Sequence, residues 1–430
     1  MRQLTVHPRA PLRGQGHVPG DKSISHRALL LGALAEGTSE ITGFLPASDC
    51  LATMNCLRAL GVEIKAHNTD QLAVHGRGLH GLQVSADPLD CVRSGTTMRL
   101  LTGILAGQPF ESTLTGDEQL LRRPMRRVVE PLRRMGADIK DTNGHAPLTV
   151  NGRSLRGAVH ELDVASAQVK SALLLAGLSA DGSTTVRQPG PARDHTERML
   201  ATMGTDIQTS GLTVTLHPIS HLSPLSLCIP GDVSSAAFLL VAATLVPGSE
   251  VTVLGVGVNP TRTGLLDVLQ AMGTELYVDN RRTAAGEPVA DVTSRASKLR
   301  GVTVAGDTVV RMIDEFPILA VAATQARGTT IVRDAEELRV KETNRIETVV
   351  QELRTLGAHI EAKADGFVVE GPTPLQGGVV DSHGDHRVAM ALTVAGLIAE
   401  RKVVVRDVEC IGDSFPGFAD QMSNLGANCG

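Results

Sequence analysis

The side chains best suited to chemistry stand in short polar segments, each directly before an apolar stretch rich in alanine and leucine. Lys22, Ser23 and Arg27 open the first of these stretches. The free N–H groups at a helix start carry partial positive charge, so they attract phosphate or carboxylate, and Lys22 and Arg27 would strengthen that attraction. The spacing does not fit a P-loop, because Asp21 separates Gly20 from Lys22. An ordinary capped helix with exposed charges is the alternative.

Two later segments have a similar composition. Ser94 and Gly95 precede the second apolar stretch, where hydroxyl groups and a bare glycine would form a phosphate cradle, although caps of this composition are common. Gln168 and Lys170 stand at the head of the third stretch. Polar side chains at the start of an apolar helix are costly unless they meet a partner, so these two residues favour a polar ligand.

Acidic and basic residues are mixed in the second half of the chain. Asp314 and Glu315 are expected to start the fifth apolar helix, where the helix dipole would keep a carboxylate ionised. Lys341 and Arg345 are expected on one helical face, with Glu342 three residues before Arg345. A surface ladder of ion pairs is the alternative interpretation of this segment.

Three further arginines belong to the candidate set. Arg387 adjoins an apolar run and is difficult to explain as a solvated charge, whereas Arg123 lies in a basic cluster of the kind that is most often a solvated face. Arg193 heads another helix, and capping alone would explain it. If equivalent helix starts converge, these segments would hold a small polyanionic ligand between two halves of the molecule, with carboxylates present for proton transfer.

A sixfold repeat predicts the elements that position these segments. The motif Leu-x-x-Leu/Met-Gly before a short strand recurs with a glycine suited to the left-handed end of a helix, at Gly61, Gly136, Gly204, Gly273, Gly357 and Gly426. A buried helix rich in Ala and Leu precedes each motif, beginning near Ser23, Ser94, Ser166, Ser234, Asp314 and Asp385. Each repeat is therefore expected to be βαβαββ-like, in an α/β protein whose two halves meet near Pro230.

Composition excludes several classes of function. The 430 residues allow two or three domains, and the net charge of −5 gives no global basic field for nucleic acid or an acidic membrane. Seven Phe, one Tyr and no Trp cannot supply stacking platforms for single-stranded nucleic acid. The six cysteines form no CxxC pair and no His cluster has zinc-ligand spacing, which favours reduced thiols, no metal and a cytoplasmic protein. No apolar stretch reaches the roughly 18 residues of a membrane span.

The ordered motifs resemble those of the 5-enolpyruvylshikimate-3-phosphate synthase family over nearly the whole chain. They are Gly20-Asp21-Lys22-Ser23, Ser94-Gly95-Thr96 with Arg99, Arg123-Pro124, Ser166-Ala167-Gln168, Asp314, Lys341-Glu342-Thr343-Asn344-Arg345 and Gly384-Asp385-His386-Arg387. The resemblance implies transfer of the enolpyruvyl group of phosphoenolpyruvate to the 5-hydroxyl of shikimate 3-phosphate in the shikimate pathway. Phosphate would leave through a tetrahedral intermediate, without a cofactor or metal.

The resemblance also implies the fold and the roles of individual residues. It predicts the two-domain enolpyruvyl transferase fold in a monomer, with residues 1–18 and 231–430 in one domain, 19–230 in the other, and the active site in the cleft between them. Shikimate 3-phosphate would be held by Lys22, Ser23, Arg27, Ser166, Ala167, Gln168, Arg193, Asp314 and Lys341. Phosphoenolpyruvate would be held by Lys22, Gly95, Arg123, Gln168, Arg345 and Arg387. Asp314 would accept the hydroxyl proton, and Glu342 with Lys22 would protonate and deprotonate the methylene carbon.

The sequence departs from the family pattern at Arg93, Asn344 and Asp413, where Asn, Asp and Lys are usual. One rival is the related UDP-N-acetylglucosamine enolpyruvyl transferases, which share the six-unit fold but carry a reactive Cys before the Arg-Pro segment. Residues 111–123 contain no Cys. A rival of another class is a repeat scaffold that binds anions without catalysis, and it would tolerate the loss of the Asp314 and Glu342 carboxylates.

Overall fold

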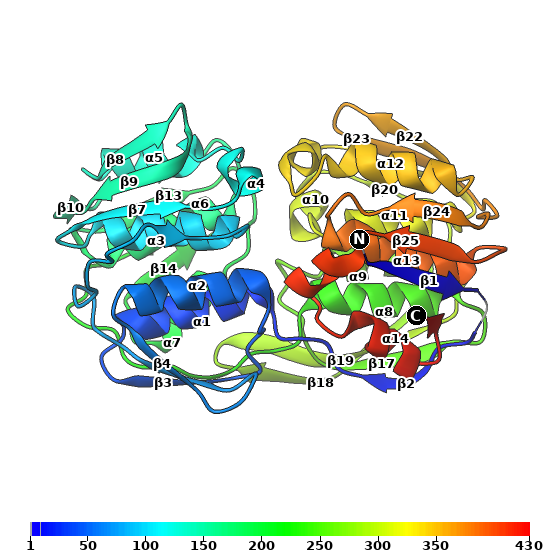
Figure 1. The fold of residues 1–430 in the computed structure, drawn as a ribbon, viewed down its shortest axis with the longest axis horizontal. Helices are drawn as coiled ribbons and strands as arrows, with labels where there is room; N and C mark the ends of the chain where they lie inside the picture. Colours follow the sequence, from blue (N-terminus) through cyan, green and yellow to red (C-terminus); the bar gives the residue numbers. More distant parts are fainter. Residues whose placement is uncertain (1, 9) are drawn as a thin grey trace. The chain divides into compact units, whose positions relative to one another are not determined.

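The computed structural model describes residues 2–8 and 10–430, and the chain forms two compact units (Figure 1). Unit 1 comprises Met1–Pro19, Pro230–Arg282 and Pro288–Gly430. Unit 2 comprises Gly20–Ile229 together with the short segment Thr283–Glu287. Most of unit 2 is therefore one continuous stretch of chain, inserted between the first and second of the three parts of unit 1.

Unit 2 contains three four-stranded sheets and one two-stranded sheet, with strand orders β16-β3-β5-β4, β6-β7-β9-β8, β11-β13-β15-β14 and β10-β12. The strands are β3 (Thr38–Thr42), β4 (Glu63–Ala66), β5 (Leu72–His75), β6 (Leu89–Asp90), β7 (Glu111–Thr115), β8 (Asp138–Thr142), β9 (His145–Asn151), β10 (Leu155–Arg156), β11 (Val159–Glu161), β12 (Ala180–Asp181), β13 (Thr184–Arg187), β14 (Ile207–Ser210), β15 (Thr213–Leu216) and β16 (Ser226–Cys228). The helices are α1 (Lys22–Leu34), α2 (Ser48–Ala59), α3 (Gly95–Ala106), α4 (Glu118–Leu121), α5 (Arg126–Arg134), α6 (Ala167–Gly177) and α7 (His195–Thr202).

Unit 1 contains three four-stranded sheets, with strand orders β18-β19-β17-β2, β20-β21-β23-β22 and β24-β25-β1-β26. The strands are β1 (Gln3–His7), β2 (Arg13–Gly16), β17 (Glu250–Gly257), β18 (Glu275–Ala284), β19 (Glu287–Arg295), β20 (Thr303–Val304), β21 (Gly328–Val332), β22 (His359–Lys363), β23 (Gly366–Gly371), β24 (Gly378–Asp381), β25 (Val403–Arg406) and β26 (Asn428–Cys429). The helices are α8 (Val233–Leu245), α9 (Gly264–Met272), α10 (Asp307–Arg311), α11 (Phe316–Thr324), α12 (Arg345–Thr355), α13 (His386–Ile398) and α14 (Phe418–Asn424), with short 3-10 helices η1 (Glu336–Val340) and η2 (Val408–Asp413).

One strand pattern recurs in the four-stranded sheets. In the sheet β6-β7-β9-β8, β7 pairs in parallel with β6 and antiparallel with β9, and β9 pairs antiparallel with β8. The sheets that contain β21 and β25 repeat this arrangement. A parallel pair needs a crossover connection, which a helix supplies here, whereas antiparallel neighbours need only a short turn. These mixed sheets confirm the α/β repeat that the sequence predicts.

The helices predicted to be buried are buried. They are α1, α3 and α6 in unit 2, and α8, α11 and α13 in unit 1 (Figure 1). In α8, every residue from Val233 to Thr244 is buried. Small residues let such helices approach closely: a Cβ atom at Gly103 of α3 would lie 2.2 Å from the carbonyl oxygen of Ala172 on α6, so only glycine fits there.

Two helix starts differ from the prediction. The fifth buried helix begins at Phe316, so Asp314 lies in the turn before it. The helix α12 begins at Arg345, because the side chain of Asn344 caps it, and Lys341 lies before that cap with an extended backbone. The prediction that Lys341 and Arg345 share one helical face is therefore wrong.

The six glycines of the repeat motif all have a left-handed backbone. Their φ angles are +83° at Gly61, +96° at Gly136, +90° at Gly204, +102° at Gly273, +88° at Gly357 and +108° at Gly426. Residues with a Cβ atom rarely adopt such angles, so glycine ends each helix and lets the chain turn into the next strand. This confirms the prediction made from the motif.

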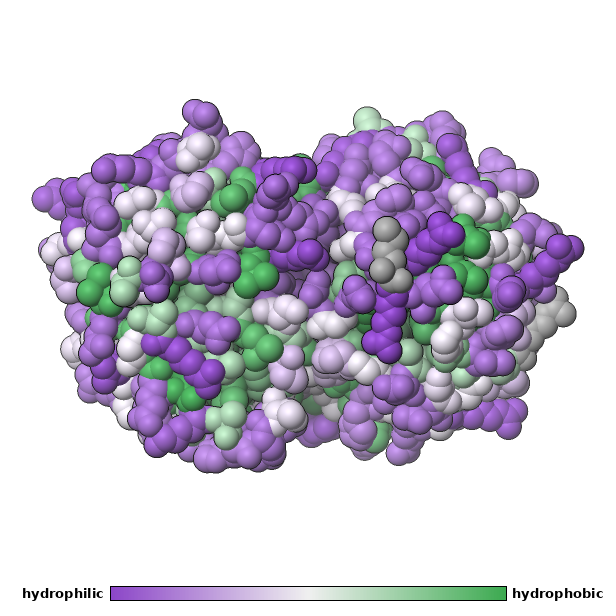
Figure 2. All heavy atoms as spheres, in the orientation of Figure 1, coloured by the Kyte–Doolittle hydropathy of each residue, from purple (hydrophilic) through white to green (hydrophobic). Residues whose placement is uncertain are grey.

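The visible surface is mainly hydrophilic, with single hydrophobic residues scattered over it (Figure 2). Among the described residues, exposed large hydrophobic side chains include Val84, Val159, Tyr277 and Val379. Among the described helices, none has the length and apolarity that crossing a bilayer requires. The same residues contain no group of three or more His, Cys, Asp or Glu that could hold a metal ion.

Candidate active site

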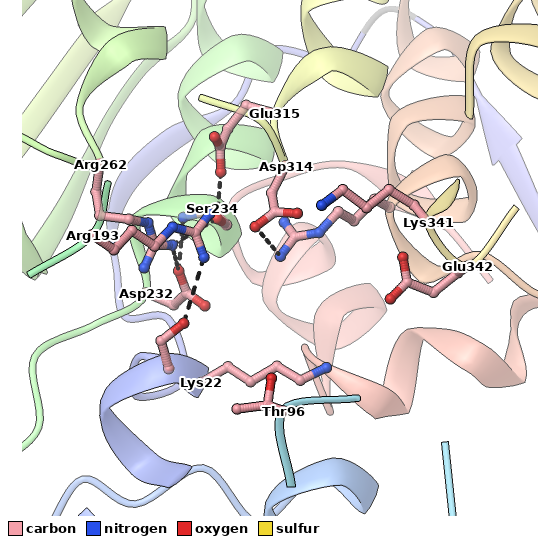
Figure 3. A network of polar contacts seen from close by, with 12 residues as sticks. Lys22, Thr96, Arg193, Asp232, Ser234, Arg262, Asp314, Glu315, Lys341 and Glu342 are labelled. Carbon is pink, nitrogen blue, oxygen red and sulfur yellow. Dashed lines mark hydrogen bonds and ion pairs between the residues drawn. The ribbon is translucent and has the colours of Figure 1, made fainter. Parts of the chain in front are cut away.

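The start of α1 in unit 2 carries the first group of predicted site residues. Asp21 caps the helix by accepting a hydrogen bond from the backbone N–H of Ile24 at 2.9 Å. The ammonium group of Lys22, 16% exposed, lies 2.5 Å from Asp49 Oδ2. Arg193 Nη1 donates to the hydroxyl oxygen of Ser23 at 3.5 Å (Figure 3). Lys22, Ser23 and Arg193 therefore belong to one neighbourhood, with Asp49 as a member that the sequence analysis missed.

Arg27 of α1 connects this helix to α6 and α7 through hydrogen bonds. Its side chain donates to Thr196 Oγ1 and Ser171 Oγ at 2.7 Å each, and to the carbonyl oxygen of Ser23 at 2.9 Å. All three acceptors are neutral groups. Burial lowers the pKa of Arg27 to about 10, despite the attraction of more distant carboxylates such as Glu197. In this structure Arg27 supports the backbone of the predicted anion site at Ser23.

The starts of α3 and α6 meet through side chains. Arg99 Nη1 donates to Gln168 Oε1 at 2.5 Å, and Gln168 Nε2 donates to Thr96 Oγ1 at 2.9 Å. A Cβ atom at Gly95 would lie 2.8 Å from Arg99 Nη1 and 3.3 Å from Arg123 Nη1. The structure thus brings Gly95, Arg123 and Gln168 together, and a side chain at position 95 would have to displace the guanidinium group of Arg99.

The helix caps of this region are hydroxyl groups. Ser94 accepts from the backbone N–H of Thr97 at 3.1 Å, and Ser166 accepts from that of Val169 at 3.4 Å. Such caps leave further N–H groups of the first turn directed toward the region before the helix. The predicted residues Ser166 and Ala167 are the N-cap and the first residue of α6.

The polar partner predicted for Lys170 is a protein side chain. Its ammonium group lies 2.5 Å from Glu197 Oε1, and the two side chains are 2% and 7% exposed. A buried lysine needs such a compensating charge. The polar head of α6 therefore has two explanations: Gln168 belongs to the candidate site, whereas Lys170 belongs to a structural ion pair.

A buried chain of hydroxyl groups joins the starts of α1, α2 and α3, and the sequence analysis did not find it. His26 Nδ1 lies 2.7 Å from Thr53 Oγ1, Thr53 Oγ1 lies 2.6 Å from Thr97 Oγ1, and Thr97 Oγ1 donates to Ser94 Oγ at 2.7 Å. Burial lowers the pKa of His26 to about 3, although Asp49 acts in the opposite direction. His26 is a neutral structural residue that holds two candidate binding segments in register.

Arg345 organises the candidate residues of unit 1. Its side chain is 1% exposed, and its guanidinium group lies 2.8 Å from Asp385 Oδ2, 2.6 Å from Glu342 Oε2 and 3.3 Å from Asp314 Oδ1. Burial alone would lower the pKa of Arg345, but these three carboxylates raise it above its ordinary value. In turn, the contact with Arg345 keeps the pKa of Asp385 below its usual range, against the effect of burial.

Two more predicted residues lie beside this cluster. Arg387 Nη2 lies 3.7 Å from Asp314 Oδ2, and Asp385 accepts from the backbone N–H of Arg387 at 2.9 Å. Burial lowers the pKa of Lys341, and the charge of Asp314 partly offsets that effect. Asp314, Glu342, Lys341, Arg345 and Arg387, predicted from three separate segments, are therefore neighbours in unit 1.

Two of the three departures from the family pattern have a structural role in this chain. Arg93 pairs with Asp117, the N-cap of α4, at 2.9 Å, and its side chain is half exposed. Asn344 caps α12, a role that Asn and Asp fill equally well. Asp413 ends η2, and nothing in the structure explains its choice over Lys.

The chain is similar to known proteins over nearly its whole length. The sequence pattern of EPSP synthase (3-phosphoshikimate 1-carboxyvinyltransferase) matches residues 6–422. The chain belongs to the EPSP synthase family. A 3-phosphoshikimate 1-carboxyvinyltransferase of Herpetosiphon aurantiacus is 54% identical over 423 residues, which cover 97% of this chain and 98% of the relative. One of Geobacter sulfurreducens is 52% identical over 420 residues, which cover 97% and 98%.

Solved structures of the same family show the same fold. An EPSP synthase from Acinetobacter baumannii, determined at 2.37 Å, matches with a TM-score of 0.91 and 42% identity, over 100% of this chain and 99% of that one. Membership of the EPSP synthase family makes the chain an enzyme, a transferase of the shikimate pathway that moves the enolpyruvyl group of phosphoenolpyruvate to shikimate 3-phosphate. The activity predicted from the ordered motifs is confirmed, and the repeat scaffold without catalysis is excluded.

Proposed function

We propose that the candidate residues form two overlapping groups, each of which binds one of the two substrates. Shikimate 3-phosphate is bound by Lys22, Ser23, Arg27, Ser166, Ala167, Gln168, Arg193, Asp314 and Lys341. Phosphoenolpyruvate is bound by Lys22, Gly95, Gln168, Arg123, Arg345 and Arg387. The two phosphates and two carboxylates of these substrates carry about −5 to −6 in total, so cations and helix starts are suited to hold them. The enzyme acts as a monomer in the cytoplasm and needs neither cofactor nor metal, since side chains perform the proton transfers.

The observation that carries the proposal is the contact of both catalytic carboxylates with one guanidinium group. Arg345 Nη1 lies 3.3 Å from Asp314 Oδ1, and Arg345 Nη2 lies 2.6 Å from Glu342 Oε2. A buried cation favours the ionised form of a carboxylate beside it, so Asp314 is prepared to accept a proton, and Glu342 is a stronger acid once it carries one. Because the same cation binds the phosphoenolpyruvate anion, substrate binding and the basicity of the carboxylates are linked.

Asp314 is suited to act on the hydroxyl group. Its Oδ1 atom lies 3.3 Å from Arg345 Nη1, and its Oδ2 atom lies 3.7 Å from Arg387 Nη2, so the carboxylate stands beside two of the cations proposed to bind phosphoenolpyruvate. In the addition step, the 5-hydroxyl oxygen of shikimate 3-phosphate bonds to C2 of phosphoenolpyruvate, and Asp314 accepts the proton of that hydroxyl group. The methylene carbon gains a proton from Glu342 or Lys22, which gives the tetrahedral intermediate.

In the elimination step, the base takes a proton back from the new methyl group, and the C–O bond to phosphate breaks. The carbon–carbon double bond forms again, and phosphate leaves with the bonding electron pair. One group must therefore act first as an acid and then as a base, which Glu342 can do because it contacts a cation and is still 25% exposed.

The test is the release of phosphate from phosphoenolpyruvate with Asp314→Asn. We expect the turnover rate to fall on the order of 10²- to 10⁴-fold, because asparagine cannot accept the hydroxyl proton. The matched control is Asp267→Asn, which removes an exposed ion pair with Arg311 in the same unit and should keep the wild-type rate. Release must also require shikimate 3-phosphate. Wild-type turnover in Asp314→Asn would remove Asp314 from the mechanism.

A further inference from the structure

Four polar side chains next to Asp314 are buried in unit 1, and the proposed mechanism uses none of them. They are Glu315, Ser234, Arg262 and Asp232, which are 1%, 1%, 2% and 3% exposed. Glu315 directly follows Asp314 and is the N-cap of α11. Asp232 caps α8, and Ser234 lies in the first turn of that helix (Figure 3). Burial of so many polar groups is costly unless hydrogen bonds satisfy them.

Hydrogen bonds connect these side chains in a fixed direction. Arg262 Nη2 donates to Asp232 Oδ1 at 3.0 Å and to Ser234 Oγ at 2.9 Å, and Ser234 Oγ in turn donates to Glu315 Oε1. A guanidinium group can only donate, and a serine hydroxyl has a single hydrogen. Since Ser234 accepts from Arg262, its hydrogen is directed to Glu315. We call these four side chains the Glu315 chain.

The Glu315 chain joins three separate segments of unit 1 to the residue beside the proposed base. Arg262 stands just before α9, Asp232 and Ser234 at the start of α8, and Glu315 at the start of α11. Asp232 also accepts from the backbone N–H of Ser234 at 2.9 Å, so the chain is anchored in the first turn of α8. The main chain at Asp314 thus has a support on one side, while its carboxylate contacts Arg345 on the other.

We infer that Ser234 and Glu315 are positioning residues, which fix the backbone of Asp314 so that its carboxylate stays directed at the reacting hydroxyl. The inference depends on the proposed role of Asp314 as the base. A buried network of charged hydrogen bonds is stiff, and Ser234, Arg262 and Asp232 each take part in two of its bonds. A base that is displaced by about 1 Å loses on the order of 10²-fold in rate, so such a support matters for turnover more than for substrate affinity.

The decisive variants are Ser234→Ala and Glu315→Gln, measured in the full-length enzyme. Ser234→Ala removes the bridge between Arg262 and Glu315, and we expect kcat to fall about 10- to 100-fold while both KM values change by less than about threefold. Glu315→Gln keeps an acceptor oxygen for Ser234, so its loss should be smaller than that of Glu315→Ala. Ser235→Ala is the matched control, since it removes a neighbouring buried hydroxyl that is no part of the Glu315 chain.

Rates are measured per folded molecule, well below the melting temperature of each variant. Loss of stability alone would lower the amount of active enzyme without changing kcat, and that result would overturn the inference. So would a kcat of Ser234→Ala within twofold of that of Ser235→Ala, or an equal loss in Glu315→Gln and Glu315→Ala. The variant Asp314→Asn separates the two proposals. If Asp314→Asn keeps turnover, the proposed function of Asp314 is wrong. If Asp314→Asn loses turnover but the Ser234 and Glu315 variants keep it, only the positioning role is wrong.

Discussion

Arg27 in unit 2 and Arg345 in unit 1 are both buried arginines, yet the protein holds them in opposite ways. Arg27 donates to two hydroxyl groups and a carbonyl oxygen, and burial lowers its pKa to about 10. Arg345 contacts three carboxylates, which raise its pKa above the ordinary value. One cation is surrounded by neutral dipoles, whereas the other is outnumbered by negative charges.

This difference indicates how each region could act on a polyanionic substrate. Neutral acceptors orient Arg27 without cancelling its charge, so the start of α1 keeps a positive field for an incoming anion. The carboxylates around Arg345 offset its charge, and the contact with Arg345 keeps the pKa of Asp385 below its usual range. The two regions therefore have different proposed tasks: the first attracts anions, and the second prepares bases for proton transfer.

The largest expected effect is the removal of the cation of unit 1. Arg345→Met should lower the free energy of unfolding by about 3–5 kcal/mol, because the buried carboxylate of Asp385 loses its opposite charge. Turnover should fall on the order of 10³-fold, since the bases lose their common partner. Urea unfolding and phosphate release would measure the two effects.

The matched control for this change is Arg354→Met in the same helix, where an exposed arginine donates to the carbonyl oxygen of Ile360. It should cost no more than about 1 kcal/mol, the net value of a hydrogen bond. If Arg345→Met destabilises the protein no more than Arg354→Met does, the three carboxylates do not depend on Arg345 for their ionised state.

The same substitution in unit 2 should cost less. Arg27→Met leaves Ser171 and Thr196 as hydroxyl groups that already hydrogen-bond each other at 2.7 Å, so they keep a partner. We expect a loss of about 1–3 kcal/mol in the free energy of unfolding. The KM for shikimate 3-phosphate should rise, because the positive field at Ser23 is lost. A loss equal to that of Arg345→Met would show that neutral and charged surroundings hold a buried arginine equally strongly.

The repeat and its helix starts could be predicted because they depend on local sequence. Gly61 and its five equivalents must adopt a left-handed backbone wherever the chain turns from helix to strand, and Ser94, Ser166 and Asp385 cap helices through their own side chains. Such features need only a few consecutive residues. The candidate residues stand at these same helix starts, which is why their order along the chain pointed to the family.

The partners of the buried charges could not be predicted, because they come from distant parts of the chain. Thr196 is 169 residues from Arg27, and Ser234 is 81 residues from Glu315. The sequence favours a ligand as the partner of Lys170, whereas the structure pairs it with Glu197 of α7. The spacing of Lys341 and Arg345 predicts one helical face, but α12 begins only at Arg345, after the cap at Asn344.

The smallest expected effect is a difference in how the stability of the two regions depends on pH. His26 in α1 has its pKa lowered to about 3 by burial, whereas its unfolded value is 6.5. Between these values the unfolded chain binds a proton that the native protein does not, so stability falls as the pH decreases below 6.5. From about pH 5.5 to about pH 4.5, this single group should cost about 1.4 kcal/mol.

The carboxylate of Asp385 behaves differently, because its pKa lies below 3.8 in the folded protein. Its contribution is present above that value and is lost only as the pH falls through the folded pKa, so the ion pair of Asp385 with Arg345 should be unaffected in the same interval. Hydrogen-exchange protection factors of α1 and α13, measured at both pH values, would test this: α1 should lose protection while α13 keeps it. In His26→Gln the extra loss in α1 should disappear, since glutamine does not titrate. An unchanged pH dependence in that variant would mean that other groups, such as the buried His160, whose pKa is also lowered by burial, control the acid sensitivity of unit 2.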